Sequence, residues 1–170
     1  MNTFRIILLC LAGIIMLSQT ALADDDEPTV EIADILQTVI KMSLKKGVSI
    51  EDAGEAMTSK ASELNLKLVG RQKVHEEVRA RGKESPHLEI LQFCTPEDAV
   101  KMVMLDPVYA AYMPCRISMV EDANGKAWLY MLNLDMLINS NTLPPELQAI
   151  AIRVNQAMLA VMTAGATGEF

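Results

Sequence analysis

The first regular pattern of hydrophobic positions along the chain lies at residues 38–44, where apolar and polar side chains alternate around Ile40 and Met42. A period of two is typical of a half-buried strand. The stretch contains no helix breaker, so its composition alone also permits a helix. Further on, the run Ser49-Ile50-Glu51-Asp52 resembles a capping box and predicts a helix that continues to about Asn65.

The pattern then changes from apolar to charged. Leu66 and Leu68 stand two residues apart and indicate a second strand. Residues 71–85 are mostly polar and charged. Gly82 lies within this segment and Pro86 follows its end. We therefore expect a loop or an irregular excursion in this part of the chain.

A strand followed by a helix is predicted next. His87 to Cys94 is rich in apolar residues and is bounded by a proline, as expected for a strand. Thr95-Pro96-Glu97-Asp98 combines an N-cap residue, a proline in the first turn and two acids at the positive end of the helix dipole. The helix that begins there should end near Asp106-Pro107, because proline cannot continue it.

Two further apolar runs, at residues 115–121 and 126–134, flank the turn sequence Asp122-Ala123-Asn124-Gly125. Asn-Gly between apolar runs is a strong hairpin signal, because both residues accept the positive φ that a tight turn requires. The sequence therefore predicts a pair of antiparallel strands here.

The last helix is predicted from Pro145 to Thr163, with Thr142 as its cap. Between Glu146 and Ala164 its only charged residue is Arg153, so more than one side of the helix should be covered. Either a homodimer contact or close packing within the monomer would cover it. Its apolar stripe consists of Leu147, Ile150, Val154, Met158 and Val161.

These elements follow one another in the order β-α-β-β-α-β-β-α. Hairpins mixed with single helices favour an α+β fold, a two-layer sandwich in which a mainly antiparallel sheet carries helices on one face. The 170 residues suit a single domain, which we assign to residues 34–164. An acidic tail at 24–33 would precede this domain and a short tail at 165–170 would follow it.

Composition narrows the classes of function. The 22 acidic and 15 basic side chains give a net charge of −7, which disfavours binding to nucleic acid, because a nucleic-acid binder must neutralise phosphates. A hydrophobic content of 51% excludes a mostly disordered chain. The sequence contains no Gly-rich phosphate loop, Gly-x-Ser-x-Gly elbow or Cys-x-x-Cys. It therefore favours a binding protein over an enzyme and assigns no catalytic residue.

Residues 1–23 have the organisation of a secretory signal peptide. Arg5 precedes an apolar run from Ile6 to Leu17, and Ala21-x-Ala23 is the small-residue pattern that signal peptidase cleaves. The run is shorter than the roughly 20 residues of a membrane span. We expect cleavage after Ala23, a periplasmic protein and no stable membrane anchor, with an uncleaved anchor as the alternative. Cleavage would also remove Cys10.

Two cysteines would then remain in an oxidising compartment where disulfides persist. Cys94 lies where a strand ends and a helix begins, so the helix dipole should lower the pKa of its thiol. Cys115 opens a later strand within Met113-Pro114-Cys115-Arg116, beside a guanidinium. The two thiols would be close if their strands are antiparallel neighbours, and far apart if the strands are linked by a parallel crossover.

Three interpretations of this pair remain open. The first is a structural disulfide, and the second is two unpaired, partly buried thiols. The third is a redox or ligand-binding site that includes Arg116, or a copper(I) site formed by Cys94, Cys115 and Met113, since soft sulfur ligands suit copper. The 12 methionines would favour metal binding, but several lie at core-like helical positions, namely Met102, Met104, Met158 and Met162.

Three stretches resemble the family called domain of unknown function 302. They are the run from Gly47 to Ala53, the run from His87 to Pro96, which ends in Phe93-Cys94-Thr95-Pro96, and the run from Met113 to Asp122, which contains Pro114-Cys115-Arg116. The resemblance implies a compact two-layer α+β domain and dimerisation, and it places Cys94 and Cys115 at two positions where the family carries cysteine or its substitutes. It implies no reaction, because fold alone does not supply one.

The sequence thus predicts an exported, non-catalytic binding or accessory domain whose ligand or protein partner is unknown. A soft metal or a redox partner would be bound through Cys94 and Cys115. The alternatives are a thiol–disulfide enzyme with Cys94 as nucleophile and an interaction protein stapled by a Cys94–Cys115 disulfide.

Overall fold

The six strands of the described chain form one antiparallel sheet in the order β1-β2-β6-β5-β4-β3. The computed structural model describes residues 30–33, 38–139 and 143–170. The strands are β1 Val30–Ala33, β2 Val39–Ser43, β3 Lys67–Lys73, β4 Leu88–Cys94, β5 Cys115–Glu121 and β6 Ala127–Leu132. The helices are α1 Ile50–Glu63, α2 Val74–Ala80, α3 Pro96–Leu105, α4 Asp135–Asn139 and α5 Pro145–Thr167, with a 3₁₀ helix, η1, at Pro107–Tyr112.

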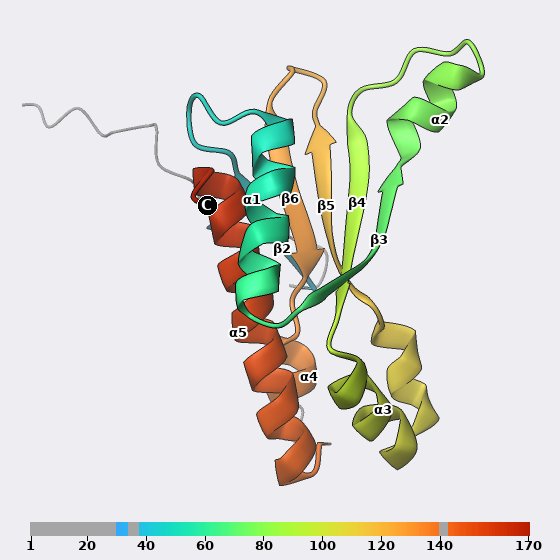
Figure 1. Ribbon diagram of the computed structural model, residues 1–170, viewed down its shortest axis with the longest axis vertical. Helices are drawn as coiled ribbons and strands as arrows, with labels where there is room; N and C mark the ends of the chain where they lie inside the picture. The colour runs from blue at the N-terminus through green and yellow to red at the C-terminus, as the bar shows by residue number, and fades with distance from the viewer. Residues whose placement is uncertain (1–29, 34–37, 140–142) are drawn as a thin grey trace, which may run out of the picture.

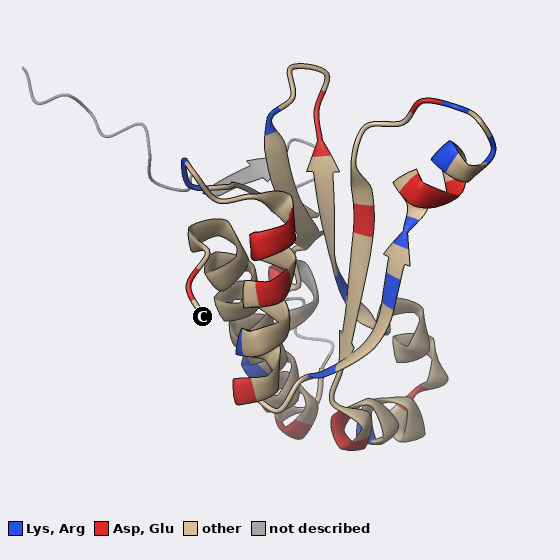
Figure 2. Ribbon diagram, turned by 45° about the horizontal axis from the view of Figure 1, so that its top comes forward, with Lys and Arg blue, Asp and Glu red and all other residues tan. Residues whose placement is uncertain are grey.

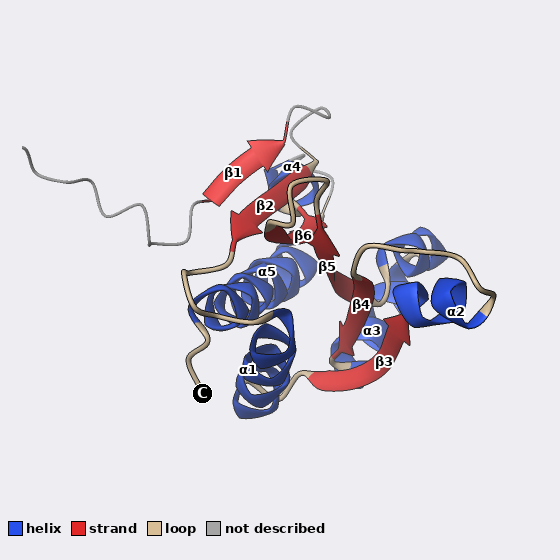
Figure 3. Cartoon of the chain, turned by 90° about the horizontal axis from the view of Figure 1, so that it is seen from above, coloured by secondary structure: helices blue, strands red, loops and turns tan. Residues whose placement is uncertain are grey.

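This architecture confirms the predicted α+β class with its antiparallel sheet. The predicted order β-α-β-β-α-β-β-α corresponds to β2, α1, β3, β4, α3, β5, β6 and α5. The sequence did not predict β1 or α4, and β1 pairs with β2 although residues 30–33 were assigned to the N-terminal tail. Figures 1 and 3 show α1 and α5 side by side on one face of the sheet, while α3 and η1 lie beyond one end of the strands. The predicted signal peptide lies outside the described residues, so export and cleavage after Ala23 stay predictions.

Local side-chain hydrogen bonds account for two of the predicted elements. The Ser49 hydroxyl accepts a hydrogen bond from the Asp52 amide at 3.0 Å, which completes the capping box of α1. In the hairpin between β5 and β6, the Asp122 carboxylate accepts from the amides of Asn124 and Lys126 at 2.8 and 3.0 Å. Gly125 adopts a φ of +76°, as the turn requires.

The prediction of a loop over residues 71–85 is wrong for residues 71–80. Strand β3 continues to Lys73 and α2 follows at once. Figure 2 shows how densely charged this region is, which is why it carries no apolar stripe. Helix α2 is held instead by His75, which is buried and contacts β4 through a hydrogen bond between its Nδ1 and the Leu88 carbonyl at 2.9 Å.

Two further details of the helices differ from prediction. Helix α5 begins after Pro144 and continues to Thr167, four residues beyond its predicted end; the predicted cap, Thr142, lies outside the described residues. Met104, which was predicted at a core position, is 82% exposed because α3 turns that face to solvent.

The main core lies between the sheet and the helix pair of α1 and α5. The largest fully buried side chains are Phe93, Met57, Leu91, Ile117, Met119, Leu129, Met158, Met162 and Val161. Helix α5 approaches α1 so closely that a Cβ on Gly165 would lie 2.5 Å from Met57 Cγ. Although α5 is long and apolar enough to cross a membrane, half of its apolar window is buried in the fold. Packing within the monomer thus accounts for much of its low charge, and the homodimer stays a prediction.

Candidate functional site

The pairing of β4 with β5 brings the two cysteines to one end of the sheet. The strands are antiparallel neighbours, and Phe93 lies opposite Cys115, so that Cys94 is one residue beyond the pair. Cys94 ends β4 and Cys115 begins β5. Both thiols are free, and no disulfide joins them in the structure.

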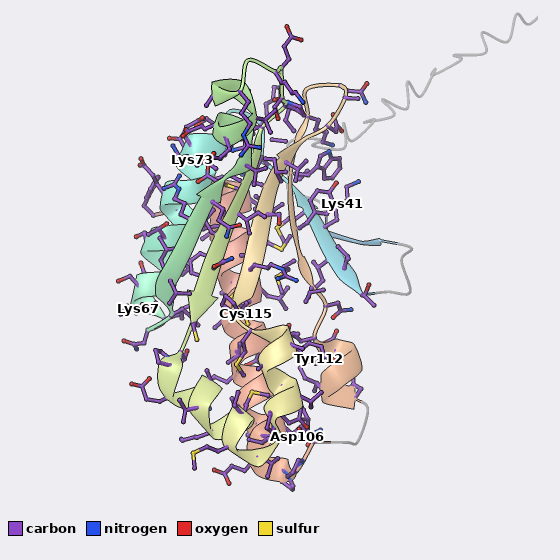
Figure 4. All side chains as sticks on the ribbon, turned by 90° about the vertical axis from the view of Figure 1, so that its right-hand side faces the viewer. Lys41, Lys67, Lys73, Asp106, Tyr112 and Cys115 are labelled. Atoms are coloured by element: carbon purple, nitrogen blue, oxygen red, sulfur yellow. The ribbon has the colours of Figure 1, made fainter. Side chains whose placement is uncertain are left out.

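Both cysteines line one pocket where the sheet meets α3, η1 and α5. The pocket has a volume of ≈ 60 Å³, small compared with sites for organic ligands, which usually measure about 300–1,000 Å³. In Figure 4, Cys115 lies at the end of the sheet above Tyr112 of η1. The sulfur-bearing residues that line the pocket are Cys94, Met102, Met113 and Cys115. Apolar and aromatic walls are supplied by Leu66, Phe93, Tyr109, Tyr112, Leu134, Ile150 and Val154, among others.

The candidate residues chosen from the sequence divide between this pocket and its neighbour. Met113 lines the same pocket as Cys94 and Cys115. These three residues are the ligands that the sequence suggests for a copper site. Arg116 does not line it. Arg116 is exposed and lines a smaller pocket of ≈ 20 Å³ that also includes Cys115. Met102 joins the site from α3, although its helical spacing had indicated only core packing.

One ion pair lies at the wall of the larger pocket. Asp98 of α3 is buried and lines the pocket, and its carboxylate accepts a hydrogen bond from Arg153 Nη2 of α5 at 2.7 Å. The pair links α3 to α5 across the pocket. Arg153, which the sequence analysis identified as the only charged residue between Glu146 and Ala164, therefore connects α5 to α3.

The prediction that Cys94 has a lowered pKa is wrong. Burial, followed by the carboxylates of Asp98 and Glu97, raises the pKa of the Cys94 thiol above its ordinary value. These two acids lie in the first turn of α3 and were part of the signal that predicts a helix there. Their full negative charges outweigh the partial positive charge of the helix end, which is equivalent to only about half an elementary charge.

The second thiol is also stabilised in its protonated form. Burial and the neighbouring Cys94 raise the pKa of Cys115, while a backbone hydrogen bond and Arg116 lower it by less. Neither thiol is therefore a ready thiolate near neutral pH, which is the form that acts as a nucleophile. A soft cation can still displace the proton from either sulfur.

Replacing Asp98 by asparagine is expected to speed the alkylation of Cys94. The loss of the carboxylate lowers the pKa of the thiol, and one nearby charge in a largely aqueous setting contributes on the order of 1 kcal/mol, or up to about fivefold in rate. Iodoacetamide labelling across pH 7–10, followed by peptide mass spectrometry, should show the gain below the pKa of Cys94 and none above it.

The Glu97→Gln variant provides the matched control for that change. Glu97 raises the pKa of Cys94 less than Asp98 does, so its removal should produce a smaller gain. Equal rates in the wild type and the Asp98→Asn variant at every pH would show that Asp98 does not influence the thiol.

Sequence reasoning missed a second polar cluster, at the opposite end of β4. The Glu89 carboxylate is buried on the core side of the sheet, where Arg71 Nε of β3 donates to it. His87 Nε2 lies 3.4 Å from Glu89 Oε2, and the His87 ring stacks on that of His75 at 4.0 Å between centroids. The available signal was the position of Glu89 on the same strand face as Leu91 and Phe93.

The surroundings of this cluster keep His87 neutral. Burial and the adjacent His75 lower the pKa of His87, against a smaller opposite influence of Glu89. Among the described residues, no group of three or more His, Cys, Asp or Glu side chains is arranged to hold a metal ion. The cluster thus has the features of a structural element that fastens α2 and β3 to the sheet.

Comparison with known proteins places the fold in a wider group. The family model described as "Domain of unknown function DUF302" matches residues 40–165. A crystal structure titled as an uncharacterized conserved protein DUF302 from Bacillus stearothermophilus superimposes with a TM-score of 0.61 and 18% sequence identity, covering 75% of this chain and 97% of that one. At that identity the likeness concerns the fold alone. No curated protein matches the chain.

Proposed function

The chain belongs to the family of domain of unknown function DUF302, and we propose that it is an exported, non-catalytic binding or accessory domain for a soft metal ion, Cu(I). The family carries no assigned reaction, so the proposal is based on the pocket of this chain. The observation that carries the proposal is the gathering of four sulfur-bearing side chains around one narrow pocket. Thiolate and thioether ligands are those that select Cu(I).

The ligands would be Cys94, Cys115 and Met113, and Met102 lines the same pocket. On binding, each thiol loses its proton to water and the sulfur gains a bond to the ion, so affinity should rise with pH. The small volume favours an ion over an organic molecule, and the apolar walls would exclude water from a bound ion. Thioether sulfur adds a neutral ligand that costs little to bury.

A thiol–disulfide enzyme with Cys94 as nucleophile is less well supported. Such a nucleophile needs a lowered pKa, whereas burial and two carboxylates raise the pKa of Cys94. A structural disulfide would consume both thiols, which are free in the structure. Counting thiols in the purified protein separates these alternatives before any metal is added.

The proposal predicts that the protein cleaved after Ala23, or the full chain with Cys10→Ser, withdraws Cu(I) from a coloured bicinchoninate complex in anaerobic titration while Cys94 and Cys115 are free. Replacing either Cys94 or Cys115 by serine should weaken binding at least tenfold, because each removes a thiolate ligand. Met113→Leu should weaken it less. The matched control is Met104→Leu, since Met104 lies on α3 outside the pocket and is exposed. Failure to withdraw Cu(I) while both thiols titrate as free would refute the proposal.

A further inference from the structure

Cys115 lines two pockets that share part of their walls. The smaller pocket shares Tyr112, Pro114, Cys115 and Leu134 with the larger one and adds a separate set of walls. Two of these additional walls are the methionines Met131 of β6 and Met158 of α5. Sulfur-bearing residues therefore line both pockets, and Cys115 belongs to each of them.

We propose that the smaller pocket is a second soft-metal position, in which Cys115, Met131 and Met158 hold one monovalent ion while the Cys115 sulfur bridges it to the ion in the larger pocket. This inference rests on the proposed function, because it extends the same site. The class of ligand is a soft monovalent cation, Cu(I) or Ag(I).

The size of the smaller pocket suits this role. Its volume of ≈ 20 Å³ exceeds the roughly 10–15 Å³ that one water molecule needs, and it leaves no room for an organic ligand. Met131 and Met158 are both buried, so they present uncharged thioether sulfur away from competing water. A thiolate sulfur has more than one lone pair and can bind two ions at once.

Charge balance favours two ions over one. Two thiolates around a single monovalent ion leave one excess negative charge in an apolar pocket, and burying an unpaired charge is costly. A second ion neutralises it. The neighbouring charged groups do not change this balance, because Asp98 is already paired with Arg153 and Arg116 is exposed at the rim.

Native mass spectrometry with Ag(I), a redox-inert probe for Cu(I), tests the inference. The full chain carrying Cys10→Ser, in which Cys94 and Cys115 are the two remaining cysteines, should take up two Ag(I) ions, each with loss of one thiol proton to the solvent. Met131→Leu should take up one, as should Met158→Leu, which serves if the first variant does not fold. Met104→Leu, the exposed control, should still take up two.

The outcomes separate the two proposals. Uptake of one ion by the Cys10→Ser chain, unchanged by Met131→Leu and Met158→Leu, would overturn the second position and leave the first in place. Uptake of no ion would overturn the proposed function itself. Uptake of two ions that both variants retain would show that the second ion lies elsewhere, and would also overturn the inference.

Discussion

Replacing Arg71 by alanine is expected to lower the free energy of unfolding by about 3 kcal/mol. Removing one partner of a buried ion pair typically costs about 3–5 kcal/mol, because the other charge is left uncompensated. Here the Glu89 side chain is only 3% exposed, whereas that of Arg71 is 37% exposed. Water can enter the space that Arg71 leaves, which places the expected cost at the lower end of that range.

His87 does not take over from Arg71. Its Nε2 lies 3.4 Å from the Glu89 carboxylate but makes no hydrogen bond. Burial and His75 lower the pKa of His87, so it supplies no positive charge at neutral pH. The buried carboxylate would therefore lose its hydrogen-bonded cation, while Lys73, which lies opposite Glu89 in the sheet, is already paired with Glu76.

Urea unfolding at pH 7.5 measures the effect. Lys60→Ala is the control, because the pair between Lys60 and Glu63 lies at the surface of α1, away from Glu89, and should contribute little. In a Glu89→Gln background, Arg71→Ala should cost much less than in the wild type. An equal cost in both backgrounds would show that Arg71 stabilises the fold through packing over α1 rather than through the ion pair.

The elements that could be predicted from the sequence are those held by neighbouring residues. Ser49 and Asp52 cap α1 within one turn, and Asp122 and Gly125 close the hairpin within five residues. The order of strands and helices followed from such signals. They act over a few residues, so reading the sequence in short windows captures them.

Helix α2 and its histidine could not be predicted in this way. The segment has no apolar stripe, and the N-cap residue Lys73 makes no side-chain cap. What holds it is contact with residues farther along the chain, since His75 meets the Leu88 carbonyl and the His87 ring. Leu88 and His87 lie too far along the chain from His75 for a pattern in the residues around His75 to reveal these contacts.

The candidate site was predictable in its residues but not in its electrostatics. Strand order decided that Cys94 and Cys115 share a pocket, and the hairpin signal gave only part of that order. The dipole argument for Cys94 treated the helix end alone and omitted the charge of Asp98, which raises the pKa of the thiol and is itself paired with Arg153. Residue type and spacing do not encode that contact.

The second large loss of stability is expected from Phe93→Ala. Phe93 belongs both to the buried core and to the wall of the pocket. Phe93 is fully buried, lies opposite Cys115 in the sheet and lines the pocket of the two thiols. Truncating a buried phenylalanine typically costs about 3–5 kcal/mol, from lost burial and the cavity left behind. Urea unfolding should show a loss of this size.

The same truncation should also enlarge the pocket beside Cys115. Leu91→Ala is the matched control, because Leu91 is equally buried and lies on the same strand face but does not line the pocket. Both variants should lose stability, yet only Phe93→Ala should speed the reaction of Cys115 with a bulky maleimide under conditions where the native state predominates. Because labelling through global unfolding would accelerate in both variants alike, a difference between them isolates the cavity as the cause. Equal acceleration would mean that Phe93 supports the fold without shaping access to the thiol.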